Sequence, residues 1–254
     1  MDEDTIVHLA ERKRTHVNLP SKLGDSLALF WMGKNIGPLN VTSGGDVPRM
    51  VRIYKEWFGL DVEDANDKLN PSDADIDCNR EENHHYFWKM SPATAVVEIP
   101  VIDPHPYITM QLNGARAQQT RDIMKTVKLP ERYKVYCIGY PGQDVRPGGI
   151  PFHSRLEDVT ALIYHSSCHI TVASFTAKLG AHIGTPTIQV HYDWPDANES
   201  WLAYLGEYGY DVCGKSEVEL EFTIRRAMRL IPEWKKKPPF SIAGLQELRA
   251  GGWY

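Results

Sequence analysis

Apolar runs of strand length recur along this chain, separated by longer segments in which apolar residues return every three or four positions. The first pattern is typical of strands buried in a parallel sheet, and the second of amphipathic helices. The expected strands are residues 16–19, 39–43, 95–99, 107–112, 133–138, 170–173 and 187–190. Their alternation with helical segments predicts an α/β fold.

The helical pattern is clearest at residues 47–58, where Val51, Tyr54 and Phe58 lie on one side. The other helices of appreciable length are expected at residues 25–32, 118–127, 156–164 and 217–230. Residues 61–85 are polar and acidic, which predicts loops around one short strand.

Prolines interrupt this alternation between residues 100 and 106, and the same alternation then starts again. A proline-rich stretch between two such series is typical of a linker between domains. The sequence therefore predicts two Rossmann-like lobes, residues 1–104 and 105–254.

The most informative segment, residues 169–191, has the sequence HITVASFTAKLGAHIGTPTIQVH. It predicts a buried strand, a turn at residues 174–176, a short helix of small residues, and a second strand. A unit this compact makes the two strands parallel and leaves the helix N-terminus at the carboxyl end of the first strand. Unpaired N–H groups and the helix dipole favour an anion there, so the segment predicts a phosphate-bearing ligand.

Composition narrows the classes of partner and the compartment. The 254 residues carry a formal net charge of -5, which gives no general attraction to nucleic acid or to anionic membranes. The chain starts without an apolar signal core and has no run of membrane-spanning length. We therefore expect a cytoplasmic protein without a membrane span.

The four cysteines are scattered and form no CxxC pair. Cys137 and Cys168 lie in or beside apolar runs, so buried thiols are expected rather than disulfides or a metal site.

Candidate chemistry begins at Lys22, Gly24, Asp25 and Ser26, between the first expected strand and its helix. Gly24 permits a tight turn. Asp25 or Ser26 would serve as an ordinary helix cap. Alternatively, the Asp25 carboxylate would lie at the carboxyl edge of a parallel sheet and act as a general base.

Two segments resemble the heptosyltransferase-like family of GT-B glycosyltransferases: LGDSLALF at residues 23–30 and VASFTAKLGAHIGTP at residues 172–186. The similarity is strongest over residues 150–191. The resemblance implies a GT-B-like α/β fold with two Rossmann-like β/α/β lobes facing a cleft. It places the acceptor on the N-terminal lobe and the nucleotide sugar on the C-terminal lobe.

The chain departs from the family pattern at three positions of the second segment. Ala173 stands where the family has Asp, Ser174 where it has Thr, and Lys178 where it has His. A sugar-contacting carboxylate is therefore missing, while Lys178 offers a cation to a diphosphate, or is a solvated helix lysine. Ser174 and Thr176 would donate hydroxyl and backbone N–H groups to phosphate, or form an ordinary helix cap.

The resemblance adds three further donor-binding candidates. Arg116 follows the first strand of the second lobe and would bind phosphate through its guanidinium, unless it is only solvated. Tyr140 would stack on a nucleotide base or cover the core. His191 follows the last strand of the segment and would border the cleft, or belong to a structural loop.

Two acidic and histidine-rich stretches give weaker grounds for a metal. Asp73 and Asp75 lie in an acidic stretch that does not follow an apolar strand, so a solvated loop is expected. His84 and His85 have no further ligand at metal-binding spacing and predict an aromatic patch with Tyr86. No metal and no cofactor is therefore expected.

The resemblance, taken with these patterns, implies a metal-independent, inverting glycosyltransferase that moves a sugar from a nucleotide-diphosphate donor to an acceptor hydroxyl, with Asp25 as the base. The resemblance implies a glycan or lipopolysaccharide acceptor. Hydroxymethylated DNA is the second acceptor class, with the basic runs at residues 12–14 and 235–237 on its phosphates. The alternatives are a non-catalytic nucleotide-sugar-binding protein, for which Ala173 is the ground, and a sugar-nucleotide epimerase.

Overall fold

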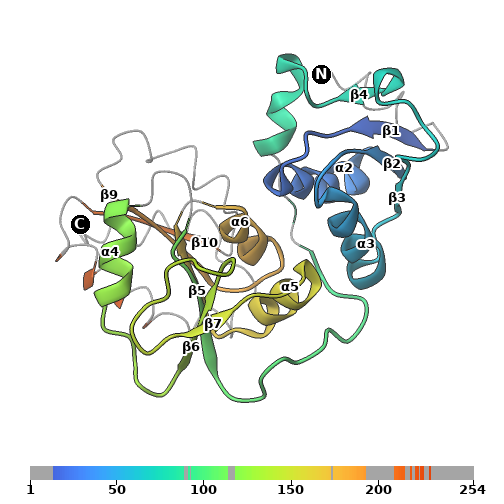
Figure 1. Cartoon of the computed structure of the whole chain (residues 1–254). Helices are drawn as coiled ribbons and strands as arrows, with labels where there is room; N and C mark the ends of the chain where they lie inside the picture. Colours follow the sequence, from blue (N-terminus) through green and yellow to red (C-terminus); the bar gives the residue numbers. More distant parts are fainter. Residues whose placement is uncertain are drawn as a thin grey trace. The chain divides into compact units, whose positions relative to one another are not determined.

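The chain divides into two compact units, Met1–Ile99 and Pro100–Tyr254, close to the boundary expected after residue 104. The computed structural model describes residues 14–88, 91, 93–113, 118–172, 174–192 and 209–214, and the helical positions 218, 221, 222, 224, 225 and 229. Each unit is built on its own parallel sheet (Figure 1). The α/β class predicted from the sequence is confirmed.

The first unit has a four-stranded sheet in the order β3-β2-β1-β4. Its elements are, in chain order, β1 (Thr15–Asn18), the 3-10 helix η1 (Leu23–Leu27), α2 (Ala28–Asn35), β2 (Leu39–Thr42), α3 (Val47–Phe58), β3 (Val62–Asp64), the 3-10 helix η2 (Pro71–Asp73), β4 (Ile76–Asp77) and the 3-10 helix η3 (Glu81–Trp88). Because the chain starts at β1, moves outward to β3 and returns to β4, the strand order reverses between β1 and β4.

The helix α3 forms where the sequence predicts it. It buries one apolar stripe, including Met50, Tyr54 and Phe58, while its other side carries charged residues. The helix ends at Gly59, whose φ of 64° is in the left-handed region that glycine adopts without strain.

Two expectations for the first unit are wrong. Residues 95–99 form no strand: Val96 is 64% exposed, and its backbone N–H donates to Trp57 O at the end of α3. Val96 covers Gly59 there, so this short apolar run packs on a helix end. Residues 61–85 contain two short strands, β3 and β4, rather than one.

The second unit has a six-stranded parallel sheet in the order β10-β9-β8-β5-β6-β7. Its elements are β5 (Tyr107–Gln111), α4 (Gln118–Thr126), β6 (Lys134–Ile138), β7 (Ile150–Phe152), α5 (Leu156–His165), β8 (His169–Val172), α6 (Phe175–His182), β9 (Thr187–Tyr192) and β10 (Gly209–Gly214). Numbered from β5, the order is the 3-2-1-4-5-6 arrangement of a Rossmann fold. The predicted strand–helix–strand unit of residues 169–191 is confirmed as β8, α6 and β9, with the two strands parallel.

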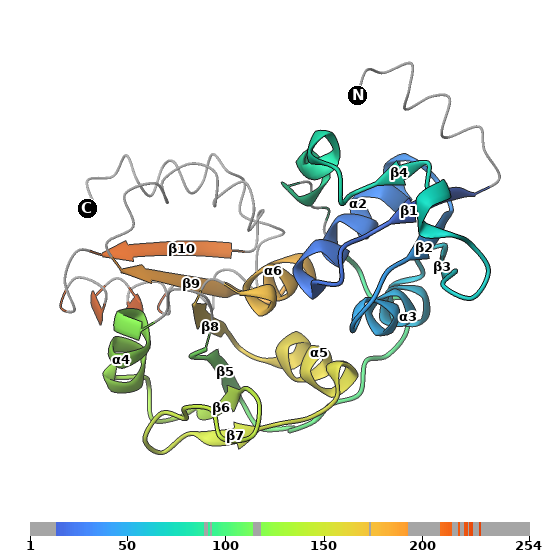
Figure 2. The same cartoon turned by 45° about the horizontal axis from the view of Figure 1, so that its top comes forward.

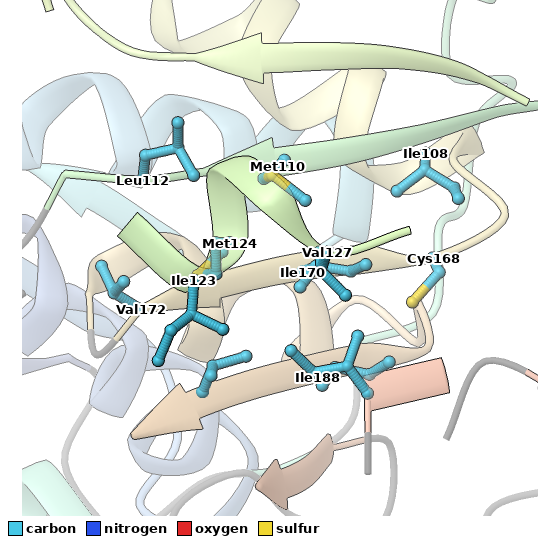
Figure 3. Close-up of a cluster of buried hydrophobic side chains, with 12 residues drawn as sticks. Ile108, Met110, Leu112, Ile123, Met124, Val127, Cys168, Ile170, Val172 and Ile188 are labelled. Carbon is cyan, nitrogen blue, oxygen red and sulfur yellow. The ribbon is translucent and has the colours of Figure 1, made fainter. Parts of the chain in front are cut away.

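One face of this sheet carries the hydrophobic core of the unit. Apolar residues from alternate positions of β5, β8 and β9 pack beneath Ile123 and Met124 of α4 (Figure 3). The strand residues on this face are Ile108, Met110, Ile170, Val172, Ile188 and Val190. Figures 1 and 2 draw α4 on the opposite side of the sheet from α5 and α6.

The opposite face of the same strands is polar. Thr109 is paired in register with His169, Gln111 with Thr171, and Thr171 in turn with Gln189 of β9. All five are buried except Gln111, which is half-buried. The helix α6 lies directly over this face, because a Cβ on Gly180 would overlap the Thr187 hydroxyl and lie 3.3 Å from His169 Cδ2.

A buried carboxylate attaches the proline-rich segment to the second unit. Asp103 accepts hydrogen bonds from Lys134 Nζ and Tyr136 Oη of β6, each at 2.8 Å, and from the backbone N–H of His105. Lys134 first, and then the His105 N–H, hold the pKa of the Asp103 carboxyl well below its usual range. The expected linker is therefore anchored at its C-terminal end to β6.

Two strands of the second unit were not predicted. Both are edge strands: β7 contains Pro151, and β10 begins and ends with glycine. The helix expected at residues 217–230 lies largely outside the described residues, although the positions described there are helical.

Two findings bear on the expectations from composition. The thiols of Cys78, Cys137 and Cys168 are buried. Among the described residues, no helix combines the length and the hydrophobicity needed to cross a bilayer.

The close approach of α6 makes a prediction about Gly180. In most helices Gly→Ala stabilises by about 0.5–1 kcal/mol, but Gly180→Ala should destabilise by about 1–3 kcal/mol because the added methyl overlaps Thr187. Urea unfolding measures the difference. In a Thr187→Ala background the cost should shrink, and an equal cost in both backgrounds would contradict the close contact.

Candidate functional site

The strand order of the second unit reverses between β5 and β8. In open α/β sheets, ligands bind outside the carboxyl ends of the strands at such a reversal. The residues that follow these ends are Leu112 and Asn113 after β5, and Ser174 and the start of α6 after β8. The side-chain Nδ2 of Asn113 is buried and has no hydrogen-bond partner among the described residues.

A buried polar cluster underlies the β8–α6 turn. The hydroxyl groups of Ser174 and Thr176 both donate to Gln111 Oε1, Ser174 at 3.1 Å. Because the single proton of Thr176 Oγ1 is used on Gln111, this oxygen accepts from His169 Nε2 at 2.9 Å. Ser174 Oγ also lies 3.0 Å from Thr171 Oγ1. The turn is thus tied to the two central strands β5 and β8.

His169 is the buried centre of this cluster. Its other ring nitrogen, Nδ1, lies 3.0 Å from Thr109 Oγ1, so both ring nitrogens meet hydroxyl groups. Burial lowers the pKa of His169 to about 3, and the imidazole is neutral at physiological pH. Neither His169 nor Gln111 is among the site residues expected from the sequence. The signal was a polar residue at every second position of strands that are otherwise apolar.

The N-terminus of α6 is not capped by its own serine. Ser174 is the N-cap residue, with the extended backbone expected there, but its side chain makes no capping hydrogen bond. Its hydroxyl is used on Gln111 instead. The first N–H groups of α6 therefore receive no acceptor from the N-cap side chain, at the edge of the sheet where a ligand is expected.

The first unit has a corresponding reversal between β1 and β4. Asn18 Nδ2 at the end of β1 donates to Asp77 Oδ1 of β4 at 3.0 Å, and Thr42 Oγ1 donates to Asn18 Oδ1 at 3.3 Å. Burial by itself raises the pKa of Asp77, but hydrogen bonds from Asn79 and Asn18 and the charge of Arg80 together lower it. A carboxylate and an amide therefore lie at this edge, and the sequence analysis had singled out neither.

Comparison with known proteins shows a similarity of fold. No family model matches the sequence, and no curated protein matches it. Three solved structures are similar: a family 9 glycosyltransferase from Veillonella parvula DSM 2008 (12% identity, TM-score 0.52, 85% of this chain and 90% of that chain), heptosyltransferase WaaC of E. coli with ADP (11%, 0.51, 87% and 99%), and the iron-containing dodecameric glycosyltransferase TibC of enterotoxigenic E. coli H10407 (14%, 0.51, 70% and 58%). This chain thus spans 58% of the length of TibC.

This chain has the GT-B fold of the heptosyltransferases. The likeness is one of fold, since the identities lie between 11% and 14%. The GT-B-like fold and the heptosyltransferase-like resemblance inferred from the two sequence segments are confirmed at this level.

Within the GT-B fold, three donor-side candidates lie around the end of β8. Ser174 is half-buried, and Thr176 is buried with its hydroxyl inside the polar cluster. Lys178 is only 9% exposed, so the reading of a solvated helix lysine is wrong. The residue at position 173 lies outside the described residues.

The other donor-side candidates are spread more widely. Tyr140 follows β6 and is 72% exposed, so it does not cover the core. His191 belongs to β9, opposite Cys213 of β10, and the expectation that it follows the strand is wrong. Its side chain and the whole of Arg116 lie outside the described residues.

The acceptor-side candidates lie at and just before η1. Lys22 is exposed and Gly24 half-buried. Ser26 is buried, and its hydroxyl donates to Leu23 O at 2.6 Å. The N-cap of α2 is Leu27, so the expectation that Asp25 or Ser26 caps this helix is wrong. Asp25 lies within η1, and its side chain is outside the described residues.

The two stretches considered as metal sites, at residues 73–75 and 84–86, make structural contacts. Asp75 accepts from the backbone N–H of His16 at 2.9 Å, and Asp73 ends the short helix η2. Tyr86 is buried against Trp31, with 6.1 Å between the ring centroids. In the part of the chain that the structure describes, no group of three or more His, Cys, Asp or Glu side chains is arranged to hold a metal ion.

The buried imidazole predicts a specific pH dependence. The pKa of His169 is about 3 in the folded state and about 6.5 when unfolded, so the unfolded state binds more protons between these values. Below pH 6.5 this single group should cost about 1.4 kcal/mol of unfolding free energy per pH unit.

The measurement is urea unfolding of the wild type and of His169→Gln at pH 7.0, 6.0 and 5.0. The first value lies above the pKa of histidine in the unfolded state, about 6.5, and the other two lie below it. Other titrating groups contribute equally to both proteins, so the difference between the two slopes belongs to His169. Parallel losses of stability in the two proteins would contradict the neutral buried imidazole.

Proposed function

We propose that this protein is a glycosyltransferase that binds a nucleotide-diphosphate sugar at the carboxyl ends of β5 and β8. The observation that carries the proposal is the reversal of strand order at this point. The N-terminus of α6 follows β8 here, and Asn113, whose Nδ2 has no partner among the described residues, follows β5. The GT-B fold supports it, since the similar structure of WaaC was solved with ADP.

Binding of the diphosphate rests on α6. Its first N–H groups, which the Ser174 side chain does not cap, its dipole and the side chain of Lys178 would stabilise the negative charge that develops on the leaving diphosphate. The hydrogen bonds of Gln111 and His169 hold the β8–α6 turn before any ligand arrives. Hydrogen-bond donors of the protein that are already in place need no reorganisation during the reaction.

The other donor contacts follow the resemblance. Arg116 is proposed to bind the diphosphate, and the exposed ring of Tyr140 to stack on the nucleotide base. His191 is proposed as a contact of the sugar. The Asp of the family turn is replaced by Ala173, so the sugar contact has to come from residues such as this one.

Transfer is proposed to proceed by direct displacement without a metal. Asp25 takes the proton of the acceptor hydroxyl. The electron pair left on the acceptor oxygen forms the new bond to the anomeric carbon. The bond from that carbon to the diphosphate breaks, and its electrons leave with the nucleoside diphosphate. The configuration inverts, with Lys22 and Gly24 lining the acceptor side and the buried Ser26 holding the turn through Leu23 O.

A glycan is the proposed acceptor, in a cytoplasmic enzyme. No described residue favours hydroxymethylated DNA as the alternative acceptor. Of the basic runs at residues 12–14 and 235–237, only Arg14 is described, and its guanidinium pairs with Asp61 and Glu63 and donates to Leu39 O. A side chain held in this way is not free for a phosphate.

A panel of nucleotide sugars with glycan acceptors separates the three candidate activities. Transfer of the sugar supports the proposal. Isomerisation of the donor sugar identifies an epimerase, and binding without turnover identifies a non-catalytic binding protein. Thermal unfolding with each nucleotide diphosphate identifies the base beforehand, because a ligand of the native state raises the melting temperature.

The role of Lys178 predicts a loss of diphosphate affinity. Lys178→Gln should raise the Kd for ADP, or for the diphosphate selected above, by about tenfold through the loss of one charge-assisted hydrogen bond. Calorimetric titration measures the Kd, and the melting temperature of the free variant reports its folding. Lys55→Gln, which changes an exposed lysine of α3, is the matched control and should leave the Kd unchanged. An unchanged Kd in Lys178→Gln would refute this role.

The role of Asp25 predicts a loss of turnover without a loss of binding. Asp25→Asn should lower the transfer rate by about 10²–10⁴-fold, because the amide does not accept the acceptor proton. Donor affinity should stay at the wild-type value, since the donor is bound by the second unit. A folded variant with undiminished transfer would remove Asp25 from the base role.

A further inference from the structure

The second unit contains a cavity of about 490 Å³ that shares no described lining residue with the proposed donor site. Its described lining comes from the connection between α4 and β6 and from helical positions after β10. The lining residues are Lys128, Leu129, Pro130, Arg132, Tyr133, Arg225 and Arg229. Because residues 128–133 lead into β6, the cavity lies at the amino end of this strand, whereas the donor site lies at the carboxyl ends.

Part of the lining of this cavity is held in place by the hydrophobic core. Leu129 and Tyr133 pack against the hydrophobic core on the α4 face of the sheet, and Ile224 belongs to that core. Arg225 therefore follows a residue that is fully buried. The guanidinium of Arg132 lies over the ring of Tyr133, 4.9 Å from its centroid, and donates to its hydroxyl at 3.1 Å. This arginine is preorganised by its own neighbour.

The charge of the lining is one-sided. Apart from Tyr133, every titratable residue of the described lining is a cation: Lys128, Arg132, Arg225 and Arg229. Among the described residues, only Arg225 has an acidic partner, Glu221 at 3.7 Å. The whole chain, by contrast, has more acidic than basic residues. Four cations around one cavity repel each other, and an anion in the cavity removes that repulsion.

A second cavity in the first unit shows what a balanced lining looks like. It measures about 500 Å³ and is also lined by four cations, Arg49, Arg52, Lys55 and Lys68. Its lining includes Glu63 and Asp64, and Glu63 pairs with Lys55 at 3.8 Å and with Lys68 at 3.9 Å. Two cavities of nearly equal size thus differ in whether the described residues of the lining supply the anions.

We propose that the cavity lined by Lys128, Arg132, Arg225 and Arg229 binds a phosphorylated small molecule with an apolar or aromatic part. Phosphate matches the four cations, and the apolar part matches Leu129, Pro130 and the ring of Tyr133. The volume is within the range of small-molecule sites, about 300–1,000 Å³. The ligand is either a nucleotide or an alkyl phosphate. This site is separate from the proposed donor site and does not depend on the proposed function.

Calorimetric titration of the full chain with AMP, octyl phosphate and inorganic phosphate tests the site. Tighter binding of AMP identifies a nucleotide site, and tighter binding of octyl phosphate identifies a site for a phosphorylated alkyl chain. The double variant Arg132→Gln, Arg229→Gln should raise the Kd of the preferred probe by about tenfold or more. High salt should weaken binding to the wild type.

The matched control is Arg49→Gln, Lys68→Gln, which removes two cations from the charge-balanced cavity and should leave the Kd unchanged. Equal losses in both double variants mean attraction to general positive charge and overturn the proposal. Inorganic phosphate bound as tightly as both organic probes, or no binding of any probe, overturns it too. A lost response to ADP in Lys178→Gln concerns the donor site alone, so the two proposals fail separately.

Discussion

In the second unit, α6 lies so close to the sheet that polar side chains fill the space beneath it. The approach is possible because Gly180 has no side chain where the helix crosses Thr187. A buried polar group without a hydrogen bond costs several kcal/mol, so every group on this face needs a partner. His169 helps to meet this requirement, because its two ring nitrogens lie within hydrogen-bond distance of hydroxyl groups on β5 and α6.

The same constraint shapes the candidate donor site. Gln111 accepts from Ser174 and Thr176, and this use of the Ser174 hydroxyl prevents it from capping α6. The packing requirement of the sheet therefore holds the turn in place and leaves the N-terminus of α6 without a capping hydrogen bond from the Ser174 side chain. A ligand anion would take the place of the missing cap, with Lys178 one turn further along the helix.

Most strands and helices of the described residues were predictable, because parallel strands such as β5 and β8 are apolar runs with helices between them. The failures have local causes. Residues 95–99 have the composition of a strand but pack on the end of α3, a tertiary contact that pattern alone does not contain. The strands β7 and β10 lie at sheet edges, where proline and glycine are tolerated and the apolar signal is weak. The polar cluster was missed because its members are far apart in sequence: Gln111 and Thr176 meet only when β5 lies beside β8.

In the proposed donor site, the residues at positions 173 and 178 would act in opposite directions on the two halves of a nucleotide sugar. Ala173 removes a carboxylate, which a neutral sugar hydroxyl uses as an acceptor and a diphosphate repels. Lys178 stands in place of the family histidine, and it is held at 9% exposure, where charge is screened less than at the surface. In the proposed donor site, both changes would strengthen recognition of the diphosphate and weaken recognition of the sugar at this turn. Selectivity for the sugar would then have to come from other residues at the carboxyl edge, and Asn113, whose Nδ2 has no partner among the described residues, has the chemistry for it.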